Sequence, residues 1–181
     1  MKSLPVVIAS AALAAAIPKV AFASSANTPE LNSHVDATME RFYEQGANHR
    51  ELARKAAAVL VFPRITKAGA GVGGEYGEGA LEVNGVKVGY YKVTGASVGA
   101  TIGAANRSEV ILFMTDTARD QFLKSNGWTI GADAGVAVVK GAGAELDTET
   151  MRRPVIAYVF GERGLIADVS LEGAKITKLP R

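Results

Sequence analysis

The stretch Leu81-Glu82-Val83-Asn84-Gly85-Val86-Lys87-Val88 is the strongest indication of fold class in this chain of 181 residues. Apolar and polar residues alternate on both sides of an Asn-Gly pair, as in two strands that present one face to a core. Both residues of a tight hairpin turn take positive φ, which asparagine and glycine tolerate best. The sequence therefore predicts an antiparallel hairpin that turns at Asn84-Gly85 and whose second strand continues through residues 90–93.

Further strand-like segments follow the hairpin. They are residues 109–114, 128–140, 154–160, 164–171 and 175–179. A short helix over residues 115–123 separates the first two, because Thr117 and Asp120 have the spacing of a capping box. Several short strands with regular turn signals are typical of an antiparallel sheet that closes, or nearly closes, into a barrel.

Two helices are predicted before the strands. The first begins at Thr28-Pro29-Glu30, because proline suits the first helical position and glutamate favours the positive end of a helix. Its buried face has apolar residues at helical spacing, namely Leu31, Val35, Met39 and Phe42. Gly46 ends this helix, and a second helix runs from Asn48 to Pro63, although residues 59–62 could already be extended.

The expected architecture is therefore α+β. An antiparallel β-barrel-like core of short strands has about three helices packed on its surface, together with flexible glycine-rich loops. Residues 24–181 form a single domain, since no linker divides them. Of the 20 glycines, 11 fall between Gly69 and Gly103. A helix zipper of small residues is one interpretation of their spacing, but the surrounding turn signals favour strands or mobile loops.

Residues 1–23 have the features of a secretory signal peptide. Lys2 provides a positive start, residues 4–17 are apolar, and Ala21-Phe22-Ala23 is a small-x-small cleavage site. No arginine pair precedes the apolar run, so we expect export by the general secretion route to the periplasm or the medium. The mature protein would be soluble and associate peripherally with membranes. Cleavage would remove two of the 20 basic residues and leave 18, which equals the 18 acidic residues.

The composition excludes several classes of site. The chain has no cysteine, which excludes disulfides, thiolate metal sites and cysteine nucleophiles, and its net charge of +2 is too small to indicate nucleic-acid binding. His34 and His49 lack acidic partners at metal-ligand spacing, and we expect both to be exposed on helices. The carboxylates of Glu75, Glu78 and Glu82 are expected to form a solvated surface beside the turn.

Two motif matches lack the context that their chemistry needs. Residues 69–74 match the dinucleotide-binding pattern G-x-G-x-x-G, but no helix follows them to hold a pyrophosphate. Residues 95–99 match the nucleophile-elbow pattern G-x-S-x-G, but no histidine follows Ser97. We therefore expect no catalytic residue, no metal site and no cofactor, in a protein that is not an enzyme.

The positive features of the sequence are basic. Five cations fall on the second predicted helix and the segment after it: Arg50, Arg54, Lys55, Arg64 and Lys67. A helix with such a basic face is typical of a segment that lies on an anionic membrane, whereas the alternative is an ordinary solvated face that contributes little. The adjoining glycine-rich loop over residues 69–79 would supply backbone N–H groups that form an anion-binding nest. Its candidate residues are Gly69, Gly71, Gly73 and Gly74.

Several stretches of the chain resemble the SYLF domain family. The longest is residues 56–79, which read AAAVLVFPRITKAGAGVGGEYGEG. Further matching pieces are residues 89–91, 97–99, 112–115, 128–134 and 164–176, so the resemblance runs in order through nearly all of residues 30–180. It implies a phospholipid-binding module, best known for phosphoinositides, with a β-barrel core, surface helices and flexible loops. In bacteria it implies an exported envelope protein.

The resemblance also bears on the site. Some eukaryotic SYLF proteins bind lipid through an amphipathic segment at the N-terminal end of the domain, and some bind actin. The segment that would correspond here is residues 48–67. Many bacterial members are lipoproteins, but this chain has no cysteine to carry a lipid anchor.

The leading hypothesis is an exported, non-enzymatic monomer that binds anionic, phosphoinositide-like headgroups through the basic helix and the glycine-rich loop. Each cation contributes roughly 1 kcal/mol at a membrane surface, so five give an upper bound of roughly 5 kcal/mol. Two alternatives stay open. One is an envelope-structural or protein-partner-binding module that contacts lipid incidentally. The other is a carrier of a small apolar ligand inside the barrel.

Overall fold

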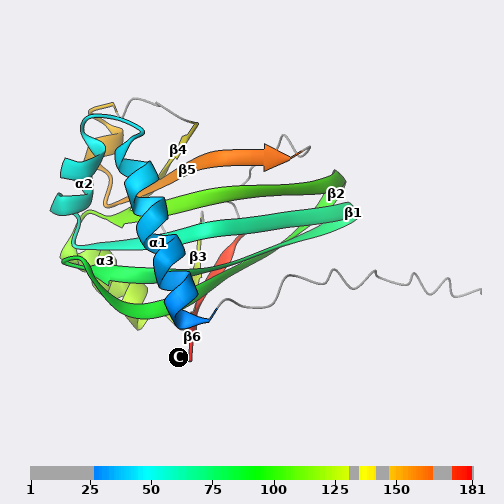
Figure 1. Ribbon diagram of the computed structural model, residues 1–181, viewed down its shortest axis with the longest axis horizontal. Coiled ribbons are helices and arrows are strands. Elements are labelled where there is room, and N and C mark those ends of the chain that lie inside the picture. The colour runs from blue at the N-terminus through cyan, green and yellow to red at the C-terminus, as the bar shows by residue number, and fades with distance from the viewer. Residues whose placement is uncertain (1–26, 131–134, 142–146, 165–172, 181) are drawn as a thin grey trace, which may run out of the picture.

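The computed structural model describes residues 27–130, 135–141, 147–164 and 173–180 (Figure 1). The predicted signal peptide and most of the predicted strand over residues 164–171 lie outside these residues. The helices are α1 (Thr28–Tyr43), α2 (His49–Lys55) and α3 (Asp116–Lys124), with a 3-10 turn η1 (Thr150–Arg152). The strands are β1 (Ala58–Val83), β2 (Val86–Phe113), β3 (Trp128–Thr129), β4 (Val136–Lys140), β5 (Val155–Gly164) and β6 (Lys175–Leu179).

The long hairpin of β1 and β2 forms most of the sheet. Its turn lies at the predicted place, since Val83 pairs with Val86, and Asn84 and Gly85 have φ values of 51° and 76°. The two strands differ from the short strands that we predicted, because they contain 26 and 28 residues. Turn-like glycines in the middle of the hairpin therefore bend the strands and do not end them.

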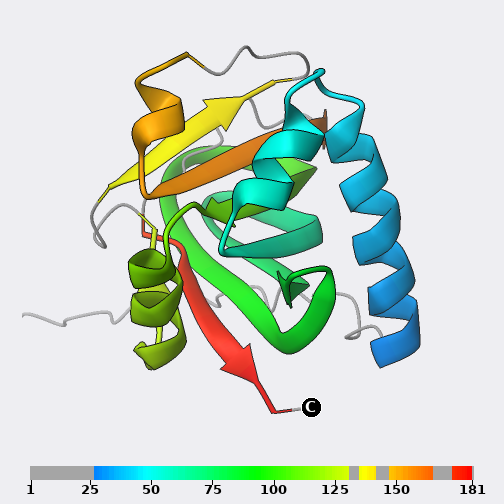
Figure 2. The same cartoon turned by 90° about the vertical axis from the view of Figure 1, so that its left-hand side faces the viewer.

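The bent hairpin curls the sheet into a barrel-like core. On the other edge of β2, residues 90–94 pair with β6 and residues 105–113 pair with β5. The strand order is β3-β6-β2-β5-β4, antiparallel except for the parallel pair of β4 and β5. Figure 2 shows the sheet curling around its interior, with α1 on one side and α3 on the other. The predicted α+β fold with a barrel-like core is confirmed.

The two halves of β1 pass close to each other inside this curl. A Cβ atom on Gly79 would lie 2.2 Å from the Val61 carbonyl oxygen, and one on Gly77 would lie 2.7 Å from the Arg64 carbonyl oxygen. Neither position has room for a side chain. Of the two interpretations of the glycine-rich segment, the strand is therefore correct and the loop is wrong, because residues 69–79 belong to β1. The absence of side chains at Gly77 and Gly79 permits the bend and the crossing.

The second helix is shorter than predicted. α2 ends at Lys55, so Pro63 lies inside β1 and does not end a helix. It falls at the register shift between Phe62 and Ile65, where the missing N–H of proline costs no ladder hydrogen bond. The extended alternative for residues 59–62 is the correct one.

The core has two layers, one on each face of the curled sheet. The inner layer includes Leu60, Ile111 and Phe113, and α3 and β3 pack against it through Phe122 and Trp128. The outer layer lies under α1 and α2, whose buried residues include the predicted apolar face Leu31, Val35, Met39 and Phe42. Among the described residues, no helix has the length and apolar character that crossing a bilayer requires.

The crossing of β1 over itself gives a first prediction. Gly79→Ala should lower the free energy of unfolding by about 1–3 kcal/mol, because the new methyl group overlaps the backbone of Val61. Gly85→Asn is the matched control, since nothing lies within 4 Å of a Cβ at Gly85 and asparagine tolerates its positive φ. Urea unfolding monitored by circular dichroism measures both changes. Equal stability of the two variants would contradict the role of this crossing.

Candidate functional site

The buried ring of His49 fixes the orientation of α2, and so decides which of its side chains face outward. The His49 ring lies 4.9 Å from the Phe42 ring and 4.8 Å from the Tyr158 ring, measured between centroids. Burial lowers the pKa of His49, and the Gly46 backbone partly offsets this. The expectation that His49 is exposed is therefore wrong. Its imidazole ring, in the first turn of α2, packs in the core as an apolar side chain would. His34 is exposed as expected.

Two of the three cations on α2 have acidic neighbours. The Arg50 guanidinium lies 4.1 Å from the centre of the Tyr43 ring, and its Nη2 is 3.4 Å from Glu40 Oε2. The Lys55 ammonium is 2.6 Å from Glu51 Oε1, one helical turn earlier. Arg54 is exposed and has no ion pair among the residues that the structure describes. Part of the predicted basic face is thus neutralised locally.

The two predicted cations on β1 have opposite environments. Arg64 is exposed and, within the described part of the chain, has no acidic partner at ion-pair distance. Lys67 is only 8% exposed, because its position on β1 faces the interior of the curled sheet. The prediction that Lys67 contributes surface charge is therefore wrong.

The glycine residues predicted as an anion nest are also corrected. They lie in extended backbone, where Gly69 pairs with Gly103, Gly73 with Ser97, and Gly74 with Ala96. A nest needs successive N–H groups that point to one side, whereas a strand points them alternately to opposite sides. Gly71 lies in the same strand. These four glycines therefore shape the sheet and form no anion-binding loop.

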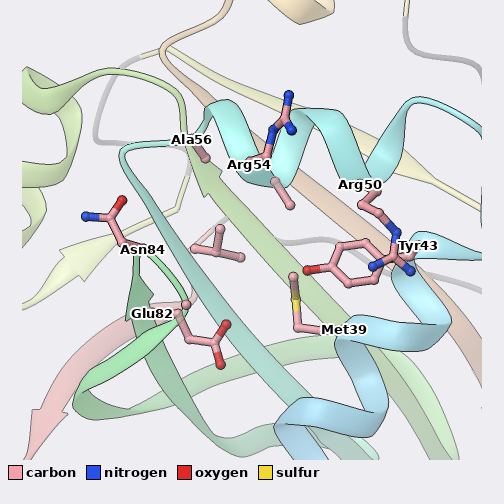
Figure 3. A pocket seen from close by; sticks show the side chains of 10 residues that line it. Met39, Tyr43, Arg50, Arg54, Ala56, Glu82 and Asn84 are labelled. Carbon is pink, nitrogen blue, oxygen red and sulfur yellow. The ribbon is translucent and has the colours of Figure 1, made fainter.

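A cavity of about 540 Å³ lies between α1, α2 and the β1–β2 turn. Its lining residues are Met39, Tyr43, Arg50, Ala53, Arg54, Ala56, Val59, Glu82, Asn84 and Gly85. Figure 3 shows Arg50 over the ring of Tyr43, with Glu82 and Asn84 across the cavity from α2. Of the nine residues predicted for the site, the fold brings Arg50 and Arg54 to this cavity, and Arg64 lies elsewhere on β1.

The cavity mixes both signs of charge. Burial raises the pKa of Tyr43, the Glu82 carboxylate raises it further, and Arg50 lowers it. Glu82 Oε1 is 3.2 Å from the Lys87 ammonium, which also contacts Asp36 on α1. This bridge joins the hairpin to α1 and holds Glu82 in place. The cavity therefore offers cationic, anionic and hydroxyl groups around an apolar floor.

Sequence reasoning missed Tyr43, Glu82 and Asn84 as site residues. Glu82 and Asn84 belong to the hairpin signal and were interpreted as surface and turn residues. Tyr43 follows Phe42, the last residue of the apolar face of α1, and belongs to no sequence motif that indicates binding. Only the docking of α1 and α2 onto the hairpin brings these three residues together.

A second polar cluster lies on the interior face of the sheet. Arg107 Nη1 is 2.9 Å from Glu75 Oε2, and Arg107 Nε is 3.8 Å from Glu109 Oε2. Neither oxygen of Glu109 has a hydrogen-bond partner among the described residues, and burial raises its pKa to about 7 against the opposing effect of Arg107. Glu75 and Glu78 are also buried, so the prediction of a solvated surface is wrong for both.

Glu109 gives a prediction of pH dependence. Its folded-state pKa of about 7 lies above the reference value of 4.5, so the folded protein binds more protons between these values. Its contribution to stability is therefore complete below pH 4.5 and is lost as the pH rises through about 7. Glu109→Gln should remove this loss and gain on the order of 3 kcal/mol over the parent between pH 5 and pH 8.

Urea unfolding at several pH values tests this prediction. Glu162→Gln, an exposed change on β5, is the matched control and should leave the pH profile of the parent unchanged. A parallel pH profile for Glu109→Gln and the parent would contradict the prediction.

Comparison with known proteins gives two matches. The family model Ysc84, described as "Las17-binding protein actin regulator", matches residues 94–180. Beta cell expansion factor A of Aeromonas veronii is 30% identical over 152 residues, which cover 80% of this chain and 54% of that protein. The chain thus spans about half the length of that relative, and the cavity lies outside the residues that the family model matches. These matches confirm the resemblance to the SYLF (Ysc84) family, which the family model places at residues 94–180.

Proposed function

We propose that this protein binds anionic phospholipid surfaces reversibly through the face formed by α2 and the neighbouring turn of β1 and β2. The observation that carries the proposal is the cavity with Arg50 and Arg54 at its edge and apolar side chains on its floor. The match of residues 94–180 to the SYLF (Ysc84) family is compatible with a function related to lipid or to actin regulation. Phosphoinositide-like headgroups that carry a single phosphodiester charge, such as that of phosphatidylinositol, are one class of anionic ligand that this face would accept.

The proposed binding is weak, because few cations are available. At this face, Arg50 and Lys55 share their charge with Glu40 and Glu51, so Arg54 contributes most. Lys67 is buried, and Arg64 lies elsewhere on β1. Surface cations act within a Debye length of about 8 Å at physiological ionic strength. The attachment is therefore sensitive to salt. We further propose that the protein is not an enzyme and acts as a monomer.

The two alternatives fare differently. The described interior is filled by rings, with Phe113, Phe122 and Trp128 at centroid separations of 4.8–5.9 Å, which leaves the hypothesis of an apolar ligand inside the barrel without support. A protein partner remains the second candidate function, favoured by the family description as a Las17-binding protein. A partner crosslinked in the cell envelope that still binds a variant unable to bind lipid would favour it.

The charge of this face can be tested directly. Arg50→Glu with Arg54→Glu should weaken co-sedimentation with anionic liposomes by about 30-fold or more, since each surface cation contributes about 1 kcal/mol. Raising the salt concentration should release the parent protein in the same assay. Lys124→Glu with Lys178→Glu changes the net charge equally at exposed positions of α3 and β6 and should have a much smaller effect. Equal binding of the parent to neutral and anionic vesicles would sink the proposal.

Export gives a separate prediction. If residues 1–23 are a signal peptide, the mature protein recovered from the envelope or medium should begin at Ser24. Mass spectrometry of the intact protein identifies its first residue. Recovery of the uncleaved chain in the cytoplasm would contradict export.

A further inference from the structure

We infer that the cavity between α1, α2 and the β1–β2 turn binds one phospholipid headgroup of a particular class, a phosphodiester with free hydroxyl groups such as glycerol or inositol. This inference rests on the proposed function and names the headgroup that the same face selects.

The dimensions and walls of the cavity suit a headgroup. Its volume of about 540 Å³ lies within the range of roughly 300–1,000 Å³ that is typical of small-molecule sites. Met39, Ala53, Ala56 and Val59 form an apolar wall, which can receive the glycerol backbone and the first acyl carbons of a lipid. On the proposed function, the source of the headgroup is a lipid in a bilayer, and the experiment includes a soluble phosphodiester to distinguish this source from a free one.

Two guanidinium groups provide the anion-binding part of the site. Arg50 and Arg54 are four residues apart on α2, so they emerge from the same side of the helix. Arg54 has no ion pair among the described residues, and Arg50 uses one nitrogen for Glu40 while its plane stacks on Tyr43. A guanidinium has five N–H donors, so both arginines keep donors for the two free oxygens of a phosphodiester.

Glu82 limits how much negative charge the cavity accepts. Its side chain is only 13% exposed, and the Lys87 ammonium at 3.2 Å holds it beside the cavity. A phosphomonoester carries nearly two negative charges at neutral pH, and its second charge would be repelled by this carboxylate. A hydroxyl group, in contrast, can donate a hydrogen bond to the carboxylate. Glu82 therefore favours a singly charged headgroup that has hydroxyls.

Two further polar groups at the cavity are available to such hydroxyls. Within the described residues, neither the Tyr43 hydroxyl nor the Asn84 amide makes a hydrogen bond. Figure 3 shows the Tyr43 hydroxyl directed toward the tip of Met39 and the middle of the cavity. The Tyr43 hydroxyl and the Asn84 amide can each donate and accept a hydrogen bond, and the Glu82 carboxylate can accept one. A polyol can both donate and accept, so it suits all three groups.

The experiment compares vesicles of equal surface charge that contain phosphatidylglycerol, phosphatidylinositol or phosphatidate in phosphatidylcholine. The parent protein should bind the first two about three- to tenfold more tightly than phosphatidate, a difference of one or two hydrogen bonds. Glu82→Gln should remove this preference by raising phosphatidate binding. Tyr43→Phe should weaken phosphatidylglycerol binding severalfold and leave phosphatidate binding unchanged. Glu162→Gln, exposed on β5, is the matched control for the loss of one carboxylate.

A second variant covers the case in which Glu82→Gln fails to fold. Ala53→Leu keeps a good helix former on α2 but fills the cavity from its wall. It should abolish the headgroup preference while salt-sensitive binding to every anionic vesicle persists. Circular dichroism establishes that each variant is folded.

The outcomes separate this inference from the proposed function. Equal binding of the parent to all three anionic vesicles, with no change in Glu82→Gln or Ala53→Leu, overturns the inference and leaves general anionic binding intact. No binding to any anionic vesicle overturns the proposed function itself. If soluble glycerophosphoglycerol binds as tightly as phosphatidylglycerol vesicles, the ligand is a free phosphodiester, and the assignment to a membrane lipid is overturned.

Discussion

The close crossing of β1 over itself is the constraint on which the rest of the structure depends. Gly77 and Gly79 bring one half of the strand within contact distance of the other, at the carbonyls of Arg64 and Val61. Because the hairpin bends there, the two halves of β2 meet different neighbours, β6 and β5, and the sheet curls around a core. A straight hairpin of this length would leave both faces in water. The curl also forms an outer face that α1 and α2 cover.

The docking of α1 and α2 decides which charges are available for binding. His49 and Leu52 hold α2 against the outer core, which turns Arg50 and Arg54 toward the hairpin turn. Acidic residues one turn away or on α1 neutralise part of this charge, and the interior of the sheet takes Lys67. The proposed binding face is therefore a mixed cavity with a few cations at its edge. Such a face gains its selectivity from hydrogen bonding more than from total charge.

The interior of the sheet is polar at one end. The in-and-out alternation of β2 places Ile111 and Phe113 in the core, and the same alternation turns Glu109 and Arg107 inward. Arg107 meets Glu75 of β1 there, so the sheet buries charged side chains. Burial of Glu109 raises its pKa more than Arg107, at 3.8 Å, lowers it, so this carboxyl group is neutral in mildly acidic solution. The stability of the fold is thereby linked to pH. This cluster belongs to the architecture and lies apart from the cavity on the outer face.

The sequence by itself determined the local features: the turn at Asn84-Gly85, the apolar face of α1, the α+β class and the resemblance to the SYLF family. These depend on neighbours along the chain, through backbone preference and residue periodicity. Tertiary structure decided that residues 69–79 form a strand, that His49, Lys67, Glu75 and Glu78 are buried, and that Tyr43, Glu82 and Asn84 meet Arg50 and Arg54 at one cavity. A glycine run has the same local signal in a loop and in a bent strand. Only the partner strand and the crossing chain distinguish the two, because burial and pairing are properties of segments far apart in sequence.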